Sequence, residues 1–254
     1  MSPELEAALA AARAAGRLQR RRFGRQGAVE MKADDTPVTS ADRDSERLIR
    51  RMLDGVLPGA GFLTEEGGEV AGKGTTRWIV DPLDGTKKFV RALPFFGPCI
   101  ALERDGAVTL GVMHLPAMKE TLWAERGQGA FLNGEPIRVS EQTRLDRAYV
   151  VYSSEAEFYR RGWAKPLESL ILGTYHNPGF LDLYSYASLA CGRVDAVIDV
   201  GDSPWDIAAA QVIIEEAGGR LTDFAEDSTV YADTTLATNG SLHEALIELL
   251  TGCR

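Results

Sequence analysis

The chain opens with two stretches in which apolar residues recur at helical spacing. We predict a first helix from Pro3 to Phe23, because the segment is rich in alanine, leucine, arginine and glutamate and its leucines share one face. A second helix is predicted to begin at Thr39 or Ser40 and to end at Asp54, where Gly55 follows as a C-cap.

Residues 62–140 show a different pattern, which is typical of β-strands. Short apolar runs are separated by turn residues such as Asp105-Gly106. A strand from Thr76 to Val80 is predicted to stop at Asp81-Pro82, and two hairpins follow over residues 99–113 and 121–132. Antiparallel strands with helices to one side indicate an α+β unit, which we assign to residues 1–143.

Beyond residue 143 the predicted strands alternate with helices. The strands cover residues 149–152, 194–200 and 236–238, and the helices cover residues 181–190, 204–217 and 241–250. Such alternation favours an α/β unit with a partly parallel sheet over residues 144–254. No Gly-, Ser- or Pro-rich linker separates the two units, so we expect a tight interface between them.

Composition narrows the class of protein. The 254 residues are 44% hydrophobic, which suffices for a substantial core. A formal net charge of −9 makes nucleic acid an unfavourable partner. No apolar run is long enough to span a membrane, and no signal-peptide pattern opens the chain. We therefore expect a cytoplasmic protein, consistent with the wide spacing of Cys99, Cys191 and Cys253, which predicts free thiols.

Acidic residues gather in four short segments beside predicted strand ends or helix starts: Thr39 to Asp42, Leu63 to Glu66, Asp81 to Thr86 and Pro204 to Asp206. In the third segment, Asp81 lies at the end of the predicted strand. Pro82 is expected to end the hydrogen-bonded ladder, because proline has no N–H group. Asp84 then takes the N-cap position of a helix whose first N–H groups, at Gly85 and Thr86, form a seat for phosphate. Two carboxylates on either side of a turn can hold a hard cation such as Mg²⁺.

Each segment also has a purely local interpretation. Asp84 can be a simple N-cap, and Asp206 can complete a capping box with Ser203. Asp42 can be a first-turn acid that favours the helix dipole, and Glu65-Glu66 can be a solvated strand end. Local capping does not explain why these particular residues occur together.

The string Asp81-Pro82-Leu83-Asp84-Gly85-Thr86 resembles the D-P-[IL]-D-G-T signature of the inositol monophosphatase family of metal-dependent phosphatases. Three other segments match that family in the same order. Pro37 to Asp42 is similar to its V-T-x-x-D segment, and Phe62 to Glu66 to its G-E-E segment, with Thr64 in place of the usual Gly. Trp205-Asp206, running on to Gly219, resembles the W-D-x-A…E-A-G-G signature.

The resemblance implies a layered αβαβα sandwich of the inositol monophosphatase and fructose-1,6-bisphosphatase type, combining α/β and α+β units, and a homodimer. It also implies two or three Mg²⁺ ions. A first ion would bind Glu65, Asp81 and the backbone carbonyl of Leu83, and a second would bind Asp81, Asp84 and Asp206. A third, weaker ion would bind Glu65 and water, with Lys32 at a position where the family often has lysine near that ion.

The reaction implied is hydrolysis of a small phosphate monoester by a metal-activated water, without a covalent phospho-enzyme. Asp42 and Thr86 match the pair that orients and deprotonates this water, and Glu65 contributes to catalysis through the third ion. The amides of Gly85 and Thr86 would hold the phosphate oxygens. Part of the negative charge would thus belong to a carboxylate cluster that metal neutralises.

Residues around the leaving alcohol decide the substrate. The candidates are Arg91, Asp182, Asp199 and Asp202. Lys88 to Pro94 resembles a stretch of histidinol-phosphate phosphatases, with Ala92 in place of Gly. Histidinol is a cationic alcohol, so carboxylates near the leaving group would pair with it. Histidinol phosphate is therefore the first substrate hypothesis. Inositol 1-phosphate is the second, because Asp199 lies near where inositol-specific members carry Glu. A different class, a non-catalytic regulatory binding protein on the same fold, is the third.

Overall fold

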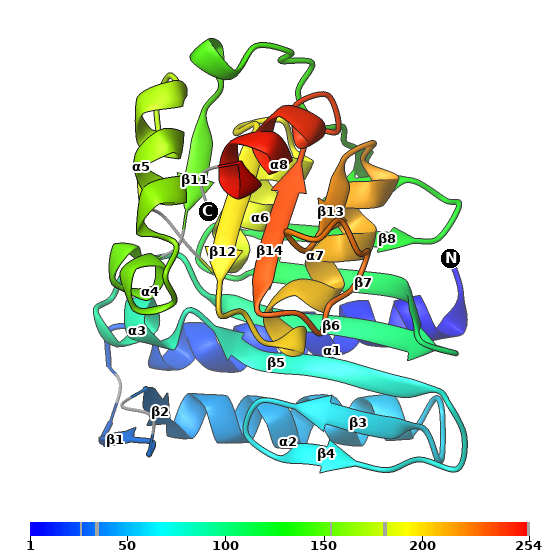
Figure 1. The fold of residues 1–254 in the computed structure, drawn as a ribbon. Helices are drawn as coiled ribbons and strands as arrows, with labels where there is room; N and C mark the ends of the chain where they lie inside the picture. The colour runs from blue at the N-terminus through cyan, green and yellow to red at the C-terminus, as the bar shows by residue number, and fades with distance from the viewer. Residues whose placement is uncertain (26, 34–35, 153, 180–181, 253–254) are drawn as a thin grey trace.

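Two β-sheets separated by a pair of helices form the framework of the molecule (Figure 1). The computed structural model describes residues 1–254 apart from 26, 34–35, 153, 180–181 and 253–254. Leu181 and Cys253, which entered the sequence predictions, lie outside the described residues. Cys99 and Cys191 are free thiols, as predicted.

The larger sheet has eight strands and is covered on one face by the first two long helices, α1 (Pro3–Arg22) and α2 (Ser40–Asp54). Its strand order is β10-β9-β8-β7-β6-β5-β3-β4. The strands are β3 (Gly61–Thr64), β4 (Gly68–Val70), β5 (Arg77–Asp84), β6 (Gly97–Arg104), β7 (Ala107–Leu115), β8 (Glu120–Glu125), β9 (Ala130–Leu132) and β10 (Glu135–Pro136). A buried stripe of small residues, including Ala8, Ala12 and Ala15, lets α1 pack closely on β6 and β7.

Two further helices, α6 (Leu183–Ala190) and α7 (Pro204–Glu216), form the middle layer. Helix α7 is apolar nearly all round, because it packs against the large sheet through β5 to β8 and against the small sheet through β13 and β14. One continuous hydrophobic core joins this layer to both sheets, and it includes Ile79, Val197 and Ile213.

The smaller sheet has the order β11-β12-β14-β13 and is covered by the last layer of helices. Its strands are β11 (Val150–Tyr152), β12 (Ala196–Val200), β13 (Arg220–Thr222) and β14 (Thr234–Thr238). Strands β11 and β12 are parallel, whereas the other two pairings are antiparallel. Helices α5 (Ala164–Gly173) and α8 (His243–Thr251), with the short α4 (Glu155–Arg160), complete the αβαβα sandwich. The predicted fold class is therefore confirmed.

Three short elements frame the end of β5. Strands β1 (Val29–Met31) and β2 (Pro37–Thr39) form a separate antiparallel pair, and helix α3 (Thr86–Val90) follows β5 directly. A 3₁₀ turn, η1 (Leu145–Arg147), lies between the two sheets in the sequence.

Several predicted boundaries were wrong. Pro82 does not end its strand, because β5 continues through a bulge to Asp84. Asp84 is consequently not a helix N-cap: Gly85 takes that position, with φ of 83°, and caps with no side chain. Strand β12 begins at Ala196, α6 at Leu183 and α8 at His243, each two residues later than predicted. Helices α4 and α5 were not predicted at all.

We propose that residues 1–143 and 144–254 are two structural units that share one core. The segment between them lies between β10 and β11, and the contacts of α7 with both sheets give the tight interface that the missing linker suggested. Within the part of the chain described, no helix combines the length and the apolar character needed to cross a membrane.

Candidate metal centre

Three aspartates from distant segments converge at the end of β5. Asp81 and Asp84 flank the bulge of this strand, and Asp206 lies in the first turn of α7. Each offers one carboxylate oxygen, and these oxygens lie within 4.8 Å of one another. Asp81 and Asp84 are only 2% and 8% exposed. Such a buried set of oxygen donors suits a hard divalent cation.

Each of these aspartates is oriented by a backbone N–H group. Asp81 Oδ1 accepts a hydrogen bond from Leu83 N at 2.8 Å, and Asp84 Oδ2 accepts one from Leu183 N at 2.5 Å. Asp206 Oδ2 accepts one from Ser203 N at 2.8 Å, as in the predicted capping box. Local capping and membership of the cluster are therefore compatible roles, since the two oxygens of a carboxylate can serve different partners.

The cluster is electrostatically unfavourable without a counter-charge. Burial raises the pKa of Asp81 well above its usual range, and the neighbouring Glu65 and Asp84 raise it further. Burial also raises the pKa of Asp84, as do Asp182 and Asp206. The pKa of Asp206 is raised by burial and by Asp202. A divalent cation would relieve this repulsion.

Asp42 and Thr86 are brought into direct contact beside the cluster. Thr86 Oγ1 lies 2.8 Å from Asp42 Oδ1 and 2.9 Å from the Leu83 carbonyl oxygen. The other carboxylate oxygen of Asp42 accepts hydrogen bonds from Thr39 N at 2.8 Å and from Thr39 Oγ1 at 2.5 Å. Asp42 is completely buried, whereas Thr86 and Leu83 line the cavity in front of the aspartates. Thr86 therefore connects the buried carboxylate to the cavity.

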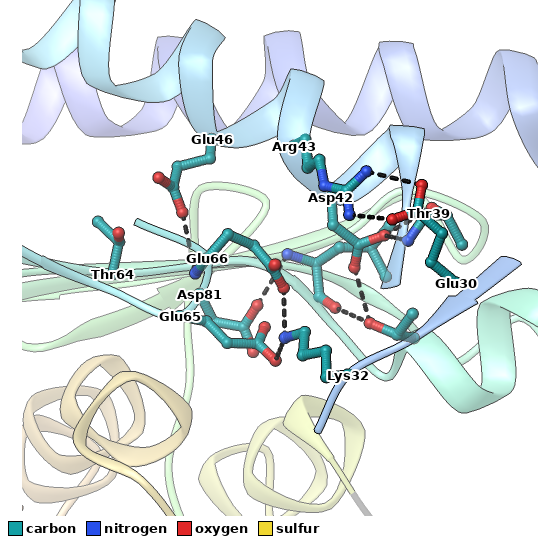
Figure 2. A network of polar contacts seen from close by, with 12 residues as sticks. Glu30, Lys32, Thr39, Asp42, Arg43, Glu46, Thr64, Glu65, Glu66 and Asp81 are labelled. Atoms are coloured by element: carbon teal, nitrogen blue, oxygen red, sulfur yellow. Dashed lines mark hydrogen bonds and ion pairs between the residues drawn. The ribbon is translucent and has the colours of Figure 1, made fainter. Parts of the chain in front are cut away.

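Glu65 lies at the edge of this cavity and forms an ion pair with a lysine (Figure 2). Lys32 Nζ is 2.8 Å from Glu65 Oε1 and 2.5 Å from Glu66 Oε1. These two carboxylates raise the pKa of Lys32 above its usual value although burial opposes the shift. Lys32 thus holds a positive charge next to Glu65, at the position where the sequence suggested a third ion.

The cavity has a volume of about 280 Å³ and extends from the aspartates toward the small sheet. Gly85 and Thr86 line it at the start of α3, and Asp182, Asp199 and Asp202 line it as well. A side chain at position 85 is excluded, because a Cβ there would lie 2.5 Å from the Phe95 carbonyl oxygen.

Two of the substrate-side predictions need qualification. Asp182 is already engaged, because Lys88 forms an ion pair with its Oδ2 atom. Arg91 is exposed at the C-cap of α3 and is not among the described residues that line the cavity. The structure therefore does not bring Arg91 together with the other candidates.

Two residues that line the cavity were not predicted from the sequence. Glu157 of α4 and Tyr186 of α6 line the wall, and Tyr186 donates a 2.5 Å hydrogen bond to Asp202. Helix α4 is too short to give a periodic signal, so nothing in the sequence pointed to Glu157. Tyr186 lies in the predicted helix of residues 181–190, but no role at the cavity was predicted for it.

The model of the inositol monophosphatase family matches residues 1–253. The chain belongs to the inositol monophosphatase family. A histidinol-phosphatase from Chlorobaculum parvum is 38% identical over 249 residues, which cover 97% of this chain and 96% of the relative. A fructose-1,6-bisphosphatase/inositol-1-monophosphatase from Thermotoga maritima is 36% identical, over 94% and 92% of the two chains. The solved structure of the extragenic suppressor protein suhB from Bartonella henselae superposes with a TM-score of 0.92 at 32% identity, over 98% of this chain and 99% of that one.

Membership of the inositol monophosphatase family makes this chain a phosphoric monoester hydrolase. The family is metal-dependent, typically on Mg²⁺, and the residues present fit such an ion. The fit rests on the donor set itself, which consists of three converging carboxylates, two of them buried, and of Leu83, which lines the same cavity.

Addition of Mg²⁺ is expected to raise the melting temperature, and to raise it more at higher pH. The carboxyl pKa values of Asp81, Asp84 and Asp206 lie above the unfolded value of about 3.8. The metal-free fold therefore loses stability as the pH rises from about 4 through the raised values, because the unfolded state releases its protons first. Metal binds the deprotonated carboxylates, so its stabilisation grows over the same range.

Differential scanning fluorimetry with about 5 mM Mg²⁺ or with EDTA, between about pH 5 and about pH 8, measures this difference. A Mg²⁺-dependent rise in melting temperature that stays constant with pH, or that is largest at the acidic end of this range, would contradict the buried metal centre.

Proposed function

We propose that this chain catalyses Mg²⁺-dependent hydrolysis of histidinol phosphate. The observation that carries the substrate choice is that two further carboxyl groups, Asp199 and Asp202, line the same cavity as the metal-binding aspartates. Histidinol carries an ammonium group and an imidazole, and both pair favourably with carboxylates.

Two or three Mg²⁺ ions held by Glu65, Asp81, the Leu83 carbonyl, Asp84 and Asp206 would neutralise the phosphate and lower the pKa of a coordinated water. Thr86 Oγ1 is placed to accept a proton from a water in the cavity while it donates its own proton to Asp42 Oδ1, 2.8 Å away. The two hydrogen bonds from Thr39 to Asp42 Oδ2 hold the acceptor in this orientation. Asp42 thus acts as the base, through Thr86.

The start of α3 supports phosphate binding in the same cavity. Gly85 and Thr86 follow the bulge of β5 directly, and their backbone N–H groups belong to the first positions of the helix. N–H groups at such positions are available to phosphate oxygens. Asp84 and Gly85 are adjacent, so the same phosphate group can meet the cation and the amide donors together.

Four carboxyl groups besides those of the metal centre line the cavity, from Glu157, Asp182, Asp199 and Asp202. Asp182 is paired with Lys88, and Glu157 is paired with Arg160 at 2.5 Å, so both carry compensating partners. Burial raises the pKa of Asp202, whereas hydrogen bonds with Tyr186 and Asp199 lower it in part. Asp199 and Asp202 thus form a linked pair that a cationic alcohol would stabilise in its charged form.

Inositol 1-phosphate is the second candidate. Its support is the family relative from Thermotoga maritima, whose name includes inositol-1-monophosphatase and whose identity to this chain, 36%, is close to that of the histidinol-phosphatase relative. Inositol is a neutral polyol that needs hydrogen bonds but no counter-charge, so the acidic wall gives it no electrostatic advantage.

A comparison of kcat/KM for histidinol phosphate and inositol 1-phosphate tests the substrate choice. We expect histidinol phosphate to be favoured by at least about tenfold, which corresponds to one well-placed ionic hydrogen bond. Asp199→Asn should lower kcat/KM for histidinol phosphate by about tenfold and that for inositol 1-phosphate by less than about twofold.

The matched control is Asp105→Asn, which changes an aspartate in the β6–β7 turn, away from the cavity. A wild-type preference for inositol 1-phosphate, or equal losses on both substrates in Asp199→Asn, would contradict the proposal.

A further inference from the structure

A buried glutamine on α1 contacts the bulge that separates two of the metal-binding aspartates. Gln19 is completely buried, and its Nε2 atom donates to the Pro82 carbonyl oxygen at 2.7 Å. The same atom lies 3.2 Å from Ser45 Oγ on α2. Gln19 thus joins both outer helices to the one stretch of β5 that interrupts its ladder with β6.

The Pro82–Leu83 peptide has no ladder partner on β6, because the register shifts between Asp81 and Asp84. Its orientation must therefore be fixed by other groups. On one side, the Pro82 oxygen accepts the hydrogen bond from Gln19; on the other, Leu83 N donates to Asp81 Oδ1 at 2.8 Å. The C=O and N–H of one trans peptide point in opposite directions, so both contacts fix the same plane.

The next peptide follows from this orientation. The Leu83 carbonyl oxygen lies 2.9 Å from Thr86 Oγ1, and Leu83 is among the described residues that line the cavity, whereas Pro82 is not. A rotation of the Pro82–Leu83 plane would move the N–H group that orients Asp81 and would also turn the Leu83 carbonyl. Asp81 and the Leu83 carbonyl oxygen are both expected ligands of the first ion. One hydrogen bond from α1 therefore controls the positions of two ligands.

The composition of α1 shows that Gln19 is not there for packing alone. Gln19 continues the buried stripe formed by Ala8, Ala12 and Ala15, in which the other members are apolar. Its Oε1 atom is buried without a hydrogen-bond partner among the described residues. Burial of an amide with only part of its hydrogen-bonding capacity satisfied costs stability. An apolar residue could supply neither the contact with Ser45 nor the one with Pro82, and of these two only the contact with Pro82 reaches the strand that carries the metal-binding aspartates.

We propose that Gln19 is a positioning residue for the metal centre, acting through the Pro82–Leu83 peptide on Asp81 and on the Leu83 carbonyl. Partners that orient metal ligands typically change metal affinity by about 10- to 100-fold when they are removed. Gln19 should accordingly set the affinity of the site for Mg²⁺ rather than the stability of the fold alone. This inference rests on the metal centre of the proposed function.

The test uses Gln19→Met, which has a similar length but no donor. The Mg²⁺ concentration that gives half of the maximal rise in melting temperature is measured by scanning fluorimetry, without turnover. We expect Gln19→Met to raise this concentration by about tenfold or more. Gln19→Leu also removes the donor and continues the apolar stripe of α1, and it should raise the concentration similarly; it provides the same test if Gln19→Met does not fold.

Two controls separate positioning from stability. Ser45→Ala removes the other partner of Gln19 Nε2, and Leu9→Ala removes packing from the same helix. Both should lower the melting temperature in EDTA and leave the half-saturating Mg²⁺ concentration within about twofold of wild type.

If wild type shows no Mg²⁺-dependent rise, the proposed function itself fails. If wild type responds and a folded Gln19 variant responds at the same Mg²⁺ concentration, the inference about Gln19 is overturned and the metal centre stands.

Discussion

Replacement of Asp84 with asparagine is expected to lower the Mg²⁺-dependent rate of phosphate release by at least about a thousandfold. Asp84 supplies one of the three oxygens that converge within 4.8 Å, and it lies next to the amide that would receive the phosphate. The loss should appear in kcat at every Mg²⁺ concentration tested, measured as phosphate released from histidinol phosphate.

The same substitution separates an enzyme from a binding protein that keeps the fold. Asp84→Asn removes one negative charge from a buried cluster, so its metal-free melting temperature should equal or exceed that of wild type. Its rise with Mg²⁺ should be much smaller. Asp54→Asn, an exposed change at the end of α2, should behave as wild type in both assays. Mg²⁺-dependent turnover that survives in Asp84→Asn would rule out the assigned site.

Replacement of Asp42 with asparagine is expected to reduce kcat by about 10²- to 10⁴-fold and to leave Mg²⁺ binding nearly intact. Asp42 is completely buried and reaches the cavity only through Thr86, so it can accept a proton but does not belong to the three-aspartate cluster. The amide of asparagine keeps the size of the side chain but is a far weaker base. Single-turnover measurements at saturating Mg²⁺ give the effect on the chemical step.

The control for this prediction is Asp44→Asn, on the same helix, which removes a surface ion pair with Arg22 and should leave kcat within about twofold. A variant of Asp42 that loses its Mg²⁺-dependent rise in melting temperature would instead assign Asp42 to the metal ligands. A variant with normal kcat would remove the relay through Thr86 from the mechanism.

The layers of this fold could be predicted from the sequence, because each long helix or strand has a clear pattern of apolar residues. Helix α1 shows a regular apolar stripe, and β6 and β7 are consecutive apolar runs around a clear turn. The end of β5 was predicted less well. Pro82 normally ends a ladder, but here a bulge removes the need for its N–H and lets the strand continue to Asp84. The preference of proline for strand ends applies to a regular ladder, and it does not predict the position of a bulge.

The aspartates of the candidate site were named from the sequence through short motifs, in which residues close in sequence carry the signal. Residues that act across the fold carry no such signal. Gln19 and Pro82 are 63 positions apart, and Lys88 meets Asp182 only because α6 begins beside α3. Arg91 illustrates the converse, because it matches a motif but lies exposed beyond the end of α3. Only the folded chain distinguishes these cases.

The position of a bound metal ion decides whether Asp81, Asp84 and Asp206 form the metal centre. Crystals of the wild-type protein soaked in Mn²⁺, which replaces Mg²⁺ and scatters anomalously, should show strong anomalous peaks between the carboxylates of Asp81, Asp84 and Asp206 and beside Glu65. Anomalous peaks confined to other parts of the molecule, with none among the three aspartates, would contradict the claim that this cluster is the metal centre of a phosphatase.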